Sequence, residues 1–511
     1  ASSTSQADSD GDGLPDCWET NGYDADGDGI VDVDLPAMGA DPLHKDIFVQ
    51  IDYMVAQDHY HYPSPAAIQT VVAAFDRAPV ENLDGKDGIH LHVDFGANAP
   101  LTWGETPTWG NLSRSKPIAE QQYIGTCSGD SVFINNFNDS EFKKIKNQNF
   151  PSERNRIFHY NVWAHSLCAL SNDGGISLSA PGSDFIVTLG KQPTEDQQVG
   201  TFMHELGHNL GLCHGGPKKS ADPSTNCPAT ASYEIRYKPN YLSVMNLYFN
   251  YYGLIINGKY RNYDYSKFNN IPSLNEGMLD ETVGLNGGTD TANYATIYYC
   301  NATQHAANSN QPIDWNCDGK ATSTNIQADI NNDSAFTLLN SDNDWANLIL
   351  PLPAVQADIS SASGVTQVIG STENDIPAGD IPLDLATKNL PPYVVDVQSP
   401  SIMNLHPGDV TTLNVTVANL GVKDDTYTLN YTAEQDWFDH TTLPASLDVA
   451  SGITKTVAVT IRIPNNVSSG TKNMLVVSAS SRNDSNLLDD TIIFVTVDPR
   501  VAPVFLPLIR K

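Results

Sequence analysis

The feature that most constrains the fold of this chain is one short run, Gly200 to His214, with the pattern His-Glu-x-x-His-x-x-Gly-x-x-His. His204 and His208 are four residues apart, so both imidazoles project from one face of a helix. Gly211 allows the backbone to leave that helix with positive φ, and the chain can then turn back to bring His214 to the same point. The sequence therefore predicts a zinc site of three histidines with a fourth position open to water.

Glu205 lies beside the first histidine on the predicted helix but is offset around it. This placement suits a base that acts on water activated by zinc, rather than a further ligand. The alternative is that these histidines are ordinary polar residues of a helix. Glycine and a third histidine at fixed offsets disfavour that alternative, because chance in a long chain supplies only the shorter HExxH pattern.

The eleven-residue pattern resembles the signature of the metzincin clan of zinc endopeptidases, in which a Met-turn follows the third histidine. Residues 241–246, Tyr-Leu-Ser-Val-Met-Asn, match that turn, and the resemblance implies that Met245 forms an apolar floor beneath the metal. It also implies a peptidase with a horizontal cleft, a twisted sheet and an active-site helix. In some clan members a tyrosine two residues after the methionine approaches the zinc. Here Leu247 holds that position, and Tyr248, one residue later, is the candidate transition-state stabiliser.

Three Asp-rich runs predict calcium loops. The first fits the twelve-position pattern D-x-D-x-D-G-x5-E throughout, and the second repeats nine positions and resembles thrombospondin type 3 and dockerin loops. The predicted ligands are Asp8, Asp10, Asp12, Leu14 (through its carbonyl), Asp16 and Glu19, then Asp24, Asp26, Asp28, Ile30 and Asp32, then Asp314, Asn316 and Asp318, with a further run at 329–333. So many close carboxylates repel one another unless a cation neutralises them. A solvated acidic turn is the alternative in each case.

Apolar periodicity predicts a multidomain protein. One mixed α/β (α+β) unit has strand patterns at 47–52, 89–94, 157–163 and 184–190 and helical patterns at 64–75 and 197–210. A second unit has only short alternating strands, such as 412–418, 427–431, 455–463 and 474–479, which is typical of an all-β immunoglobulin-like sandwich. The predicted domains are calcium loops at 1–35, a metzincin-like zinc peptidase domain at 36–353, a linker at 354–392, the sandwich at 393–499 and a C-terminal tail at 500–511. Weaker similarity to secreted bacterial metalloproteases extends over much of residues 8–350.

The charge balance narrows the possible partners. Asp and Glu number 60 against 28 Lys and Arg, and the net charge is −32. Such an acidic surface repels phosphate groups, so nucleic acid and anionic membranes are poor partners. No run approaches the roughly 18–20 apolar residues that a membrane helix needs. The polar start without Met suggests a mature form whose signal sequence was removed, and we expect a secreted protein.

Seven cysteines in such a chain indicate disulfides, although sequence alone permits several pairings. The short spacings favour Cys213 with Cys227 and Cys300 with Cys317, which leaves Cys127 with Cys168. Cys17 is then unpaired. We expect it to be a packed small residue of the first loop, the alternative being a thiolate that occupies the open zinc position.

Two further histidine pairs, His59 with His61 and His90 with His92, have the spacing that places both side chains on one side of a strand. No carboxylate cluster lies near them in the sequence. We therefore expect histidines satisfied by hydrogen bonds rather than metal ligands.

These features predict a secreted zinc endopeptidase, stabilised by calcium and acting on proteins or peptides. Glu205 would take a proton from the attacking water and return it to the leaving amine. The alternative is a non-catalytic extracellular adhesion or surface-assembly protein that retains a peptidase fold. The intact Glu205 disfavours it, because a domain kept only for its architecture needs no base.

Overall fold

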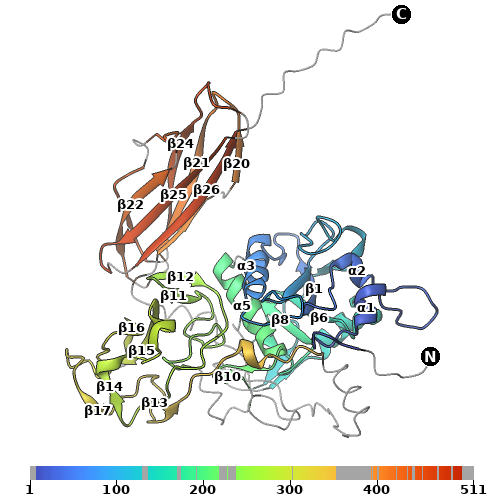
Figure 1. Cartoon of the computed structure of the whole chain (residues 1–511), viewed down its shortest axis with the longest axis horizontal. Helices are drawn as coiled ribbons and strands as arrows, with labels where there is room; N and C mark the ends of the chain where they lie inside the picture. Colours follow the sequence, from blue (N-terminus) through green and yellow to red (C-terminus); the bar gives the residue numbers. More distant parts are fainter. Residues whose placement is uncertain are drawn as a thin grey trace, which may run out of the picture. The chain divides into compact units, whose positions relative to one another are not determined.

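The computed structural model of the chain is shown in Figure 1. It describes residues 7–128, 136–169, 174–191, 193–217, 227, 237–301, 303–352 and 393–497 except 394, 400–401, 420, 422, 434, 440–442, 452, 469–470 and 485–486. These residues fall into two compact units, the first formed by residues before the predicted linker and the second by those after it together with residues 256–260. The linker at 354–392 and the C-terminal tail at 500–511 lie outside the described residues.

A mostly parallel sheet forms the centre of the first unit. Its strands are β1 (Asp46–Val55), β2 (His90–Asp94), β3 (Pro117–Ala119), β6 (Phe158–Ala164), β7 (Gly175–Ser177) and β8 (Asp184–Thr188). Their order is β2-β1-β6-β8-β7, and β3 pairs with the second half of β1. Only β7, at the edge, runs antiparallel to its neighbour β8. Strand β6 is buried along its whole length, because a parallel sheet is covered on both faces.

Two long helices, α3 (Pro65–Asp76) and α5 (Glu195–Asn209), contact each other beside this sheet, with α3 against β2 and α5 against β7 and β8 (Figure 1). Ser64 caps α3 by accepting a hydrogen bond from the amide of Ala67. The remaining α-helices of the described residues are α1 (Asp16–Asn21), α2 (Leu35–Met38) and α4 (Ser140–Asn149). Within the described part of the chain, no helix has the length and apolar character needed to cross a membrane.

Further strands precede the predicted linker and lie outside this sheet. They are β4 (Thr126–Ser128), β5 (Asn136–Asn138), β9 (Leu212–Cys213), β10 (Gly216–Pro217), β11 (Leu254–Ile256), β12 (Lys259–Asn262), β13 (Leu274–Asn275), β14 (Leu279–Asp280), β15 (Tyr294–Cys300), β16 (Thr303–Asn308), β17 (Thr324–Ile326) and β18 (Leu338–Leu339). The segment that carries the first acidic loop is part of the first unit, because Leu14 and Trp18 are buried in its main hydrophobic core.

The second unit contains strands only, among its described residues. They are β19 (Val395–Gln398), β20 (Ile402–Leu405), β21 (Val410–Asn419), β22 (Asp425–Ala433), β23 (Ser446–Val449), β24 (Thr454–Arg462), β25 (Lys472–Ser481) and β26 (Leu488–Val497). They form one sheet in the order β19-β21-β24 and another in the order β20-β26-β25-β22-β23. Alternate residues of both sheets, such as Val415 and Val477, share one buried core. All ten of the predicted strands and helices that have numbered ranges above are present.

The disulfides pair as the spacing favoured. The bonded pairs are Cys127–Cys168, Cys213–Cys227 and Cys300–Cys317. The prediction that Cys17 is packed was wrong, since this cysteine is exposed on α1. Successive residues of a helix point about 100° apart. Trp18 and Glu19 occupy the buried side of this short helix, which turns Cys17 outward.

A buried ion pair fixes the end of β2. The guanidinium of Arg154 donates to Asp94 at 2.8 Å and to the side-chain oxygen of Gln50 at 2.9 Å. Asp94 also accepts hydrogen bonds from the hydroxyl of Ser113 and the amide of Arg114. Arg154 and Asp94 are almost fully buried, so each charge depends on the other for its compensation.

We expect Asp94→Ala to lower the free energy of unfolding by about 3–5 kcal/mol, because it leaves a buried guanidinium without its counter-charge. Urea denaturation followed by tryptophan fluorescence would measure this loss. The matched control is Lys143→Ala, which removes an exposed ion pair with Asp139 and should cost no more than about 1 kcal/mol. Equal effects of the two substitutions would contradict the structural role given to Asp94.

Candidate metal centre

Helix α5 carries two of the three predicted zinc ligands and is buried along nearly all of its length. It begins with a capping box, in which the Thr194 hydroxyl accepts from the Gln197 amide and the Gln197 side chain accepts from the Thr194 amide. It ends at Asn209, and Gly211 follows with φ of +87°. That left-handed conformation suits glycine and turns the chain back into β9.

The structure brings the three predicted zinc ligands together. The ring centroids are 4.8 Å apart for His204 and His208, 4.8 Å for His208 and His214, and 5.3 Å for His204 and His214. Each ring offers a nitrogen within 4.8 Å of those of the other two. At most 2% of each residue is exposed. Three buried nitrogen donors at this spacing suit one zinc ion.

Hydrogen bonds to the main chain orient two of these rings. Nδ1 of His204 lies 2.9 Å from the carbonyl oxygen of Val244, and Nδ1 of His208 lies 2.7 Å from that of Leu212. A carbonyl oxygen can only accept, so Nδ1 carries the proton in both rings. In a neutral imidazole the lone pair is then on Nε2, which is the arrangement that a metal ligand requires.

Glu205 lies on the adjacent part of α5 and is fully buried. Its carboxylate packs against the backbone of the edge strand β7. A Cβ atom built onto Gly175 of that strand would lie 2.6 Å from Oε1 of Glu205. The missing side chain at position 175 therefore makes room for this carboxylate.

The predicted Met-turn packs directly on α5. Met245 is fully buried, and a Cβ atom at Gly207 of the helix would lie 2.5 Å from its sulfur. The turn itself is held by Asp344, which accepts hydrogen bonds from the hydroxyls of Tyr241 and Ser243 at 2.6–2.8 Å. Burial raises the pKa of Asp344 to about 7.

A disulfide and the side chain of Lys238 fix the segment around His214. The Cys213–Cys227 bond fixes the residue that precedes the third ligand. The buried ammonium of Lys238 donates to the carbonyl oxygens of Gly215 and Asn340. A covalent bond and a buried cation therefore hold the returning strand.

Tyr248, the candidate transition-state stabiliser, contacts a main-chain carbonyl and two other tyrosines. Its hydroxyl lies 3.5 Å from the carbonyl oxygen of Ile330, and its ring contacts those of Tyr237 and Tyr299. A role for Tyr248 in stabilising a transition state stays a prediction.

The first acidic loop has a dense internal hydrogen-bond pattern. Asp8 accepts from the amides of Gly11 and Gly13, and Asp12 accepts from the amide of Leu14. Asp16 accepts from the amide and hydroxyl of Ser9 at the start of the loop. Carboxylate oxygens of Asp8, Asp10 and Asp12 lie within 4.8 Å of one another.

Buried carboxylates lie behind this loop. Glu19 is 2% exposed, and neither of its oxygens has a hydrogen-bond partner among the described residues. Its oxygens lie within 4.8 Å of those of Asp12 and Asp46. Burial and the neighbouring carboxylates raise the pKa of Glu19 to about 10 and that of Asp10 to about 6. Sequence reasoning missed Asp46, which begins β1 far from the loop in sequence.

The second loop repeats the conformation of the first but is exposed. Asp24 accepts from the amides of Gly27 and Gly29, and Asp28 accepts from that of Ile30. Asp26 accepts from the amide of Asp28, and Asp32 accepts from that of Ala25. All the predicted side-chain ligands thus face the interior of their own loop.

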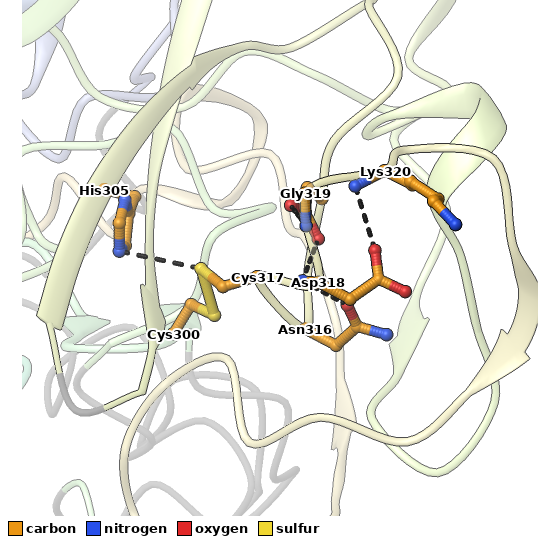
Figure 2. The surroundings of a disulfide bond; sticks show 8 residues. Cys300, His305, Asn316, Cys317, Asp318, Gly319 and Lys320 are labelled. Atoms are coloured by element: carbon orange, nitrogen blue, oxygen red, sulfur yellow. Dashed lines mark hydrogen bonds between the residues drawn. A yellow bond between two sulfur atoms is a disulfide. The ribbon is translucent and has the colours of Figure 1, made fainter.

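In the third loop, too, side-chain oxygens accept hydrogen bonds from amides of the same loop (Figure 2). Asp314 accepts from the amide of Gly319, Asn316 from that of Asp318, and Asp318 from that of Lys320. The Cys300–Cys317 disulfide anchors this loop to the end of β15.

The run at 329–333 also closes on itself, since Asp329 accepts from the amides of Asp333 and Ser334. Sequence reasoning missed two fully buried carboxylates near these loops, Glu276 and Glu281. Glu276 accepts from the Ile330 amide, and Glu281 accepts from the Ser323 amide. Both precede the loops by tens of residues, so no local pattern could have revealed them.

Two parts of the chain match known families. Residues 66–215 match the reprolysin-like metallopeptidase family M12B, and residues 394–497 match the VWA7 Ig-like domain. The first range includes His204, Glu205, His208 and His214. The two matches support a zinc metalloprotease with a C-terminal Ig-like domain. A search of the curated proteins finds no match.

Solved structures resemble the chain over about a fifth of its length. A chain of the complex of zinc 2-glycoprotein with prolactin inducible protein from human seminal plasma is 10% identical, with a TM-score of 0.17, over 20% of this chain and 94% of that chain. The PapD-like domain 7 of human CEP192 is 14% identical, with a TM-score of 0.18, over 22% and 89%. A fragment of alpha-2-macroglobulin from Escherichia coli is 17% identical, with a TM-score of 0.17, over 21% and 17%.

Asp344 should give the stability of the site a measurable pH dependence. Its pKa is about 7 in the folded protein against 3.8 for the unperturbed side chain. Between these values the folded state holds a proton that the unfolded state has released, so the contribution of Asp344 to stability falls as pH rises from about 4 to 7. Asp344→Asn cannot titrate. The melting temperature of the wild type relative to this variant should therefore decrease across that window and level off above it.

The melting temperatures of both proteins between pH 5 and 8 would test this. The exposed Asp290→Asn is the control for loss of one carboxylate elsewhere in the unit. A constant difference between wild type and Asp344→Asn at every pH would contradict the raised pKa.

Proposed function

We propose that this protein is a secreted zinc endopeptidase stabilised by calcium. The observation that carries the proposal is the set of three buried histidines beside a buried glutamate, with two rings oriented by main-chain carbonyls. Polar groups are rarely buried in this density without a ligand or a partner that uses them. The match of residues 66–215 to a metallopeptidase family supports the same reaction.

His204, His208 and His214 would hold the zinc ion. When bound, zinc supplies Lewis acidity, which lowers the pKa of water and polarises a peptide carbonyl group. The carbonyls of Val244 and Leu212 keep the first two rings in one orientation. Zinc binding would then require little further ordering of these two side chains.

Glu205 would move the proton. Its carboxylate lies on the same helix as two ligands and packs on Gly175 of the edge strand. As a general base it would accept a proton from the attacking water, and as a general acid it would return that proton to the leaving amine. No covalent intermediate with the protein is needed, because water is the nucleophile.

The first acidic loop would bind calcium. Asp8, Asp10 and Asp12 offer hard oxygen donors at close range, and Glu19 adds a buried carboxylate whose oxygens have no other partner among the described residues. Calcium prefers six to eight such oxygens. Without a cation, burial and mutual repulsion favour protonation of these groups, which the raised pKa values of Glu19 and Asp10 express.

Secretion fits the covalent structure of the chain. The three disulfides would persist outside the cell or in another oxidising compartment. Calcium is also abundant enough there to occupy weak loops.

We expect Glu205→Gln to keep about one zinc ion at the α5 site while peptide cleavage falls by about 10²–10⁴-fold, since it removes only the base. His208→Ala should lose both the zinc ion of this site and the activity. The control is Glu195→Gln, which changes another carboxylate of the same helix and should leave cleavage intact. Zinc content and the rate of cleavage of a peptide library would be measured together. Undiminished cleavage by Glu205→Gln would contradict the proposed role of this residue, and no cleavage by the wild type would favour the non-catalytic alternative.

Calcium binding to the first loop should release protons. The pKa of Glu19 is raised to about 10 and that of Asp10 to about 6, so both groups lose affinity for protons when calcium arrives. The apparent affinity for calcium should therefore rise with pH between about 6 and 9. Calcium at a hundredfold excess over Kd should stabilise the protein by about 2.7 kcal/mol.

Calorimetric titration with calcium in buffers of different ionisation enthalpy would count the released protons. Glu19→Gln should bind calcium more weakly and release fewer protons, whereas Glu141→Gln, an exposed residue of α4, should match the wild type. A wild type whose melting temperature is insensitive to calcium would show that these runs are solvated acidic turns.

A further inference from the structure

A second group of histidines lies where three neighbouring parallel strands end. Glu120 is the first residue after β3, and His165 is the first residue after β6. His59 and His61 follow β1 on a segment that folds back, with the amide of His61 donating to the carbonyl of Met54 at 2.9 Å. Strands β3 and β6 both pair with β1 in parallel. Their carboxyl ends therefore share one edge of the sheet, and side chains distant in sequence converge there.

The four side chains surround one point. Oε1 of Glu120 lies 3.4 Å from Nε2 of His59 and 3.6 Å from Nδ1 of His165. Oε2 of Glu120 lies 3.1 Å from Nε2 of His61. The ring centroids are 5.0–5.5 Å apart, close to the spacing of the α5 histidines, and the ligand atoms all lie within 4.8 Å of one another.

This cluster changes one premise of the sequence analysis, whereas the expectation of histidines satisfied by hydrogen bonds stays a prediction. His59 and His61 were expected to be satisfied histidines because no carboxylate cluster lies near them along the chain. The fold supplies Glu120 and a third histidine from 59 and more residues away. Nε2 of His59, Nδ1 of His165 and Oε2 of Glu120 are buried and have no hydrogen-bond partner among the described residues. Their ion-pair contacts, at 3.1–3.6 Å, do not have hydrogen-bond geometry.

A further carboxylate orients the first ring. Nδ1 of His59 lies 2.7 Å from Asp58, whose other oxygen accepts from the ammonium of Lys191 at 2.8 Å. With Nδ1 donating to Asp58, Nε2 of His59 is turned toward Glu120. A carboxylate behind the ring is the usual support of a histidine that binds metal.

We propose that His59, His61, His165 and Glu120 bind a second zinc ion, which joins the ends of β1, β3 and β6. Three nitrogen donors and one oxygen donor suit tetrahedral zinc, whereas calcium prefers oxygen alone. Four protein ligands leave no open position, so this ion would have a structural role. None of the four residues belongs to the α5 site, and the proposal stands whether or not the protein is a peptidase.

The test is the zinc content of the purified full chain after dialysis, measured by mass spectrometry. The wild type should hold about two zinc ions per chain, and His59→Ala with His165→Ala should hold about one. His208→Ala should also hold about one, retained at the second site. The matched control is His406→Ala, which removes a half-exposed histidine of the second unit and should leave both ions in place.

Glu120→Gln provides a variant that preserves the shape of the site. It should weaken binding of the second zinc by at least tenfold in a chelator competition while the circular dichroism of the protein stays unchanged. Cobalt substitution gives an independent readout, since tetrahedral cobalt absorbs visible light. In His208→Ala loaded with cobalt that absorption should remain, and it should disappear when His59 and His165 are replaced as well.

Two results would overturn the proposal. One is a wild type with a single zinc ion per chain together with a His208→Ala variant that holds none. The other is a second zinc ion that persists when His59, His165 and Glu120 are all replaced. The first result would identify the cluster as a network of ion pairs without metal.

Discussion

The site depends on how closely helix α5 approaches the backbone around it. A side chain at Gly200 would collide with the carbonyl oxygen of Asn250, and one at Gly207 would meet the sulfur of Met245. The two glycines therefore let the helix lie directly on the backbone of Asn250 and on the side chain of Met245. Such contacts leave little freedom to shift, because a packed interior transmits any displacement. This contact fixes the helix that carries His204, Glu205 and His208, and hydrogen bonds to main-chain carbonyls then orient the two histidine rings.

The buried polar groups of the first unit are of two kinds, those with a full set of hydrogen-bond partners and those with atoms that lack a partner among the described residues. Asp94 is saturated by Arg154, a hydroxyl and an amide, so its burial serves architecture alone. Glu19 and the pair His59 and His165 have buried atoms that no described group satisfies. Glu19 offers carboxylate oxygens and the two histidines offer imidazole nitrogens, so these are the groups to which the proposed cations would bind.

The sequence predicted those features that depend on residues close together along the chain. The spacing of His204, His208 and His214 predicted one cluster, because a helix and a glycine turn convert sequence distance directly into geometry. The apolar runs of β1 and β6 and the internal pattern of the acidic loops were predictable for the same reason. It missed Asp46, Glu120 and His165, which reach their partners through strand pairing. The register between β1, β3 and β6 is a tertiary property, and no periodicity of one segment encodes it.

The Cys213–Cys227 bond has a consequence for the survival of the molecule as an intact unit. Its two cysteines are 14 positions apart in the sequence, and the first of them is next to His214. If the backbone is cut once inside this ring, the two fragments stay joined through sulfur, and the histidine on one side remains linked to the Met-turn on the other. A nicked molecule then still holds His204, His208 and His214 within one covalently connected molecule. A cut in this segment alone therefore does not separate the two parts of the site. They separate only if the Cys213–Cys227 disulfide is also reduced.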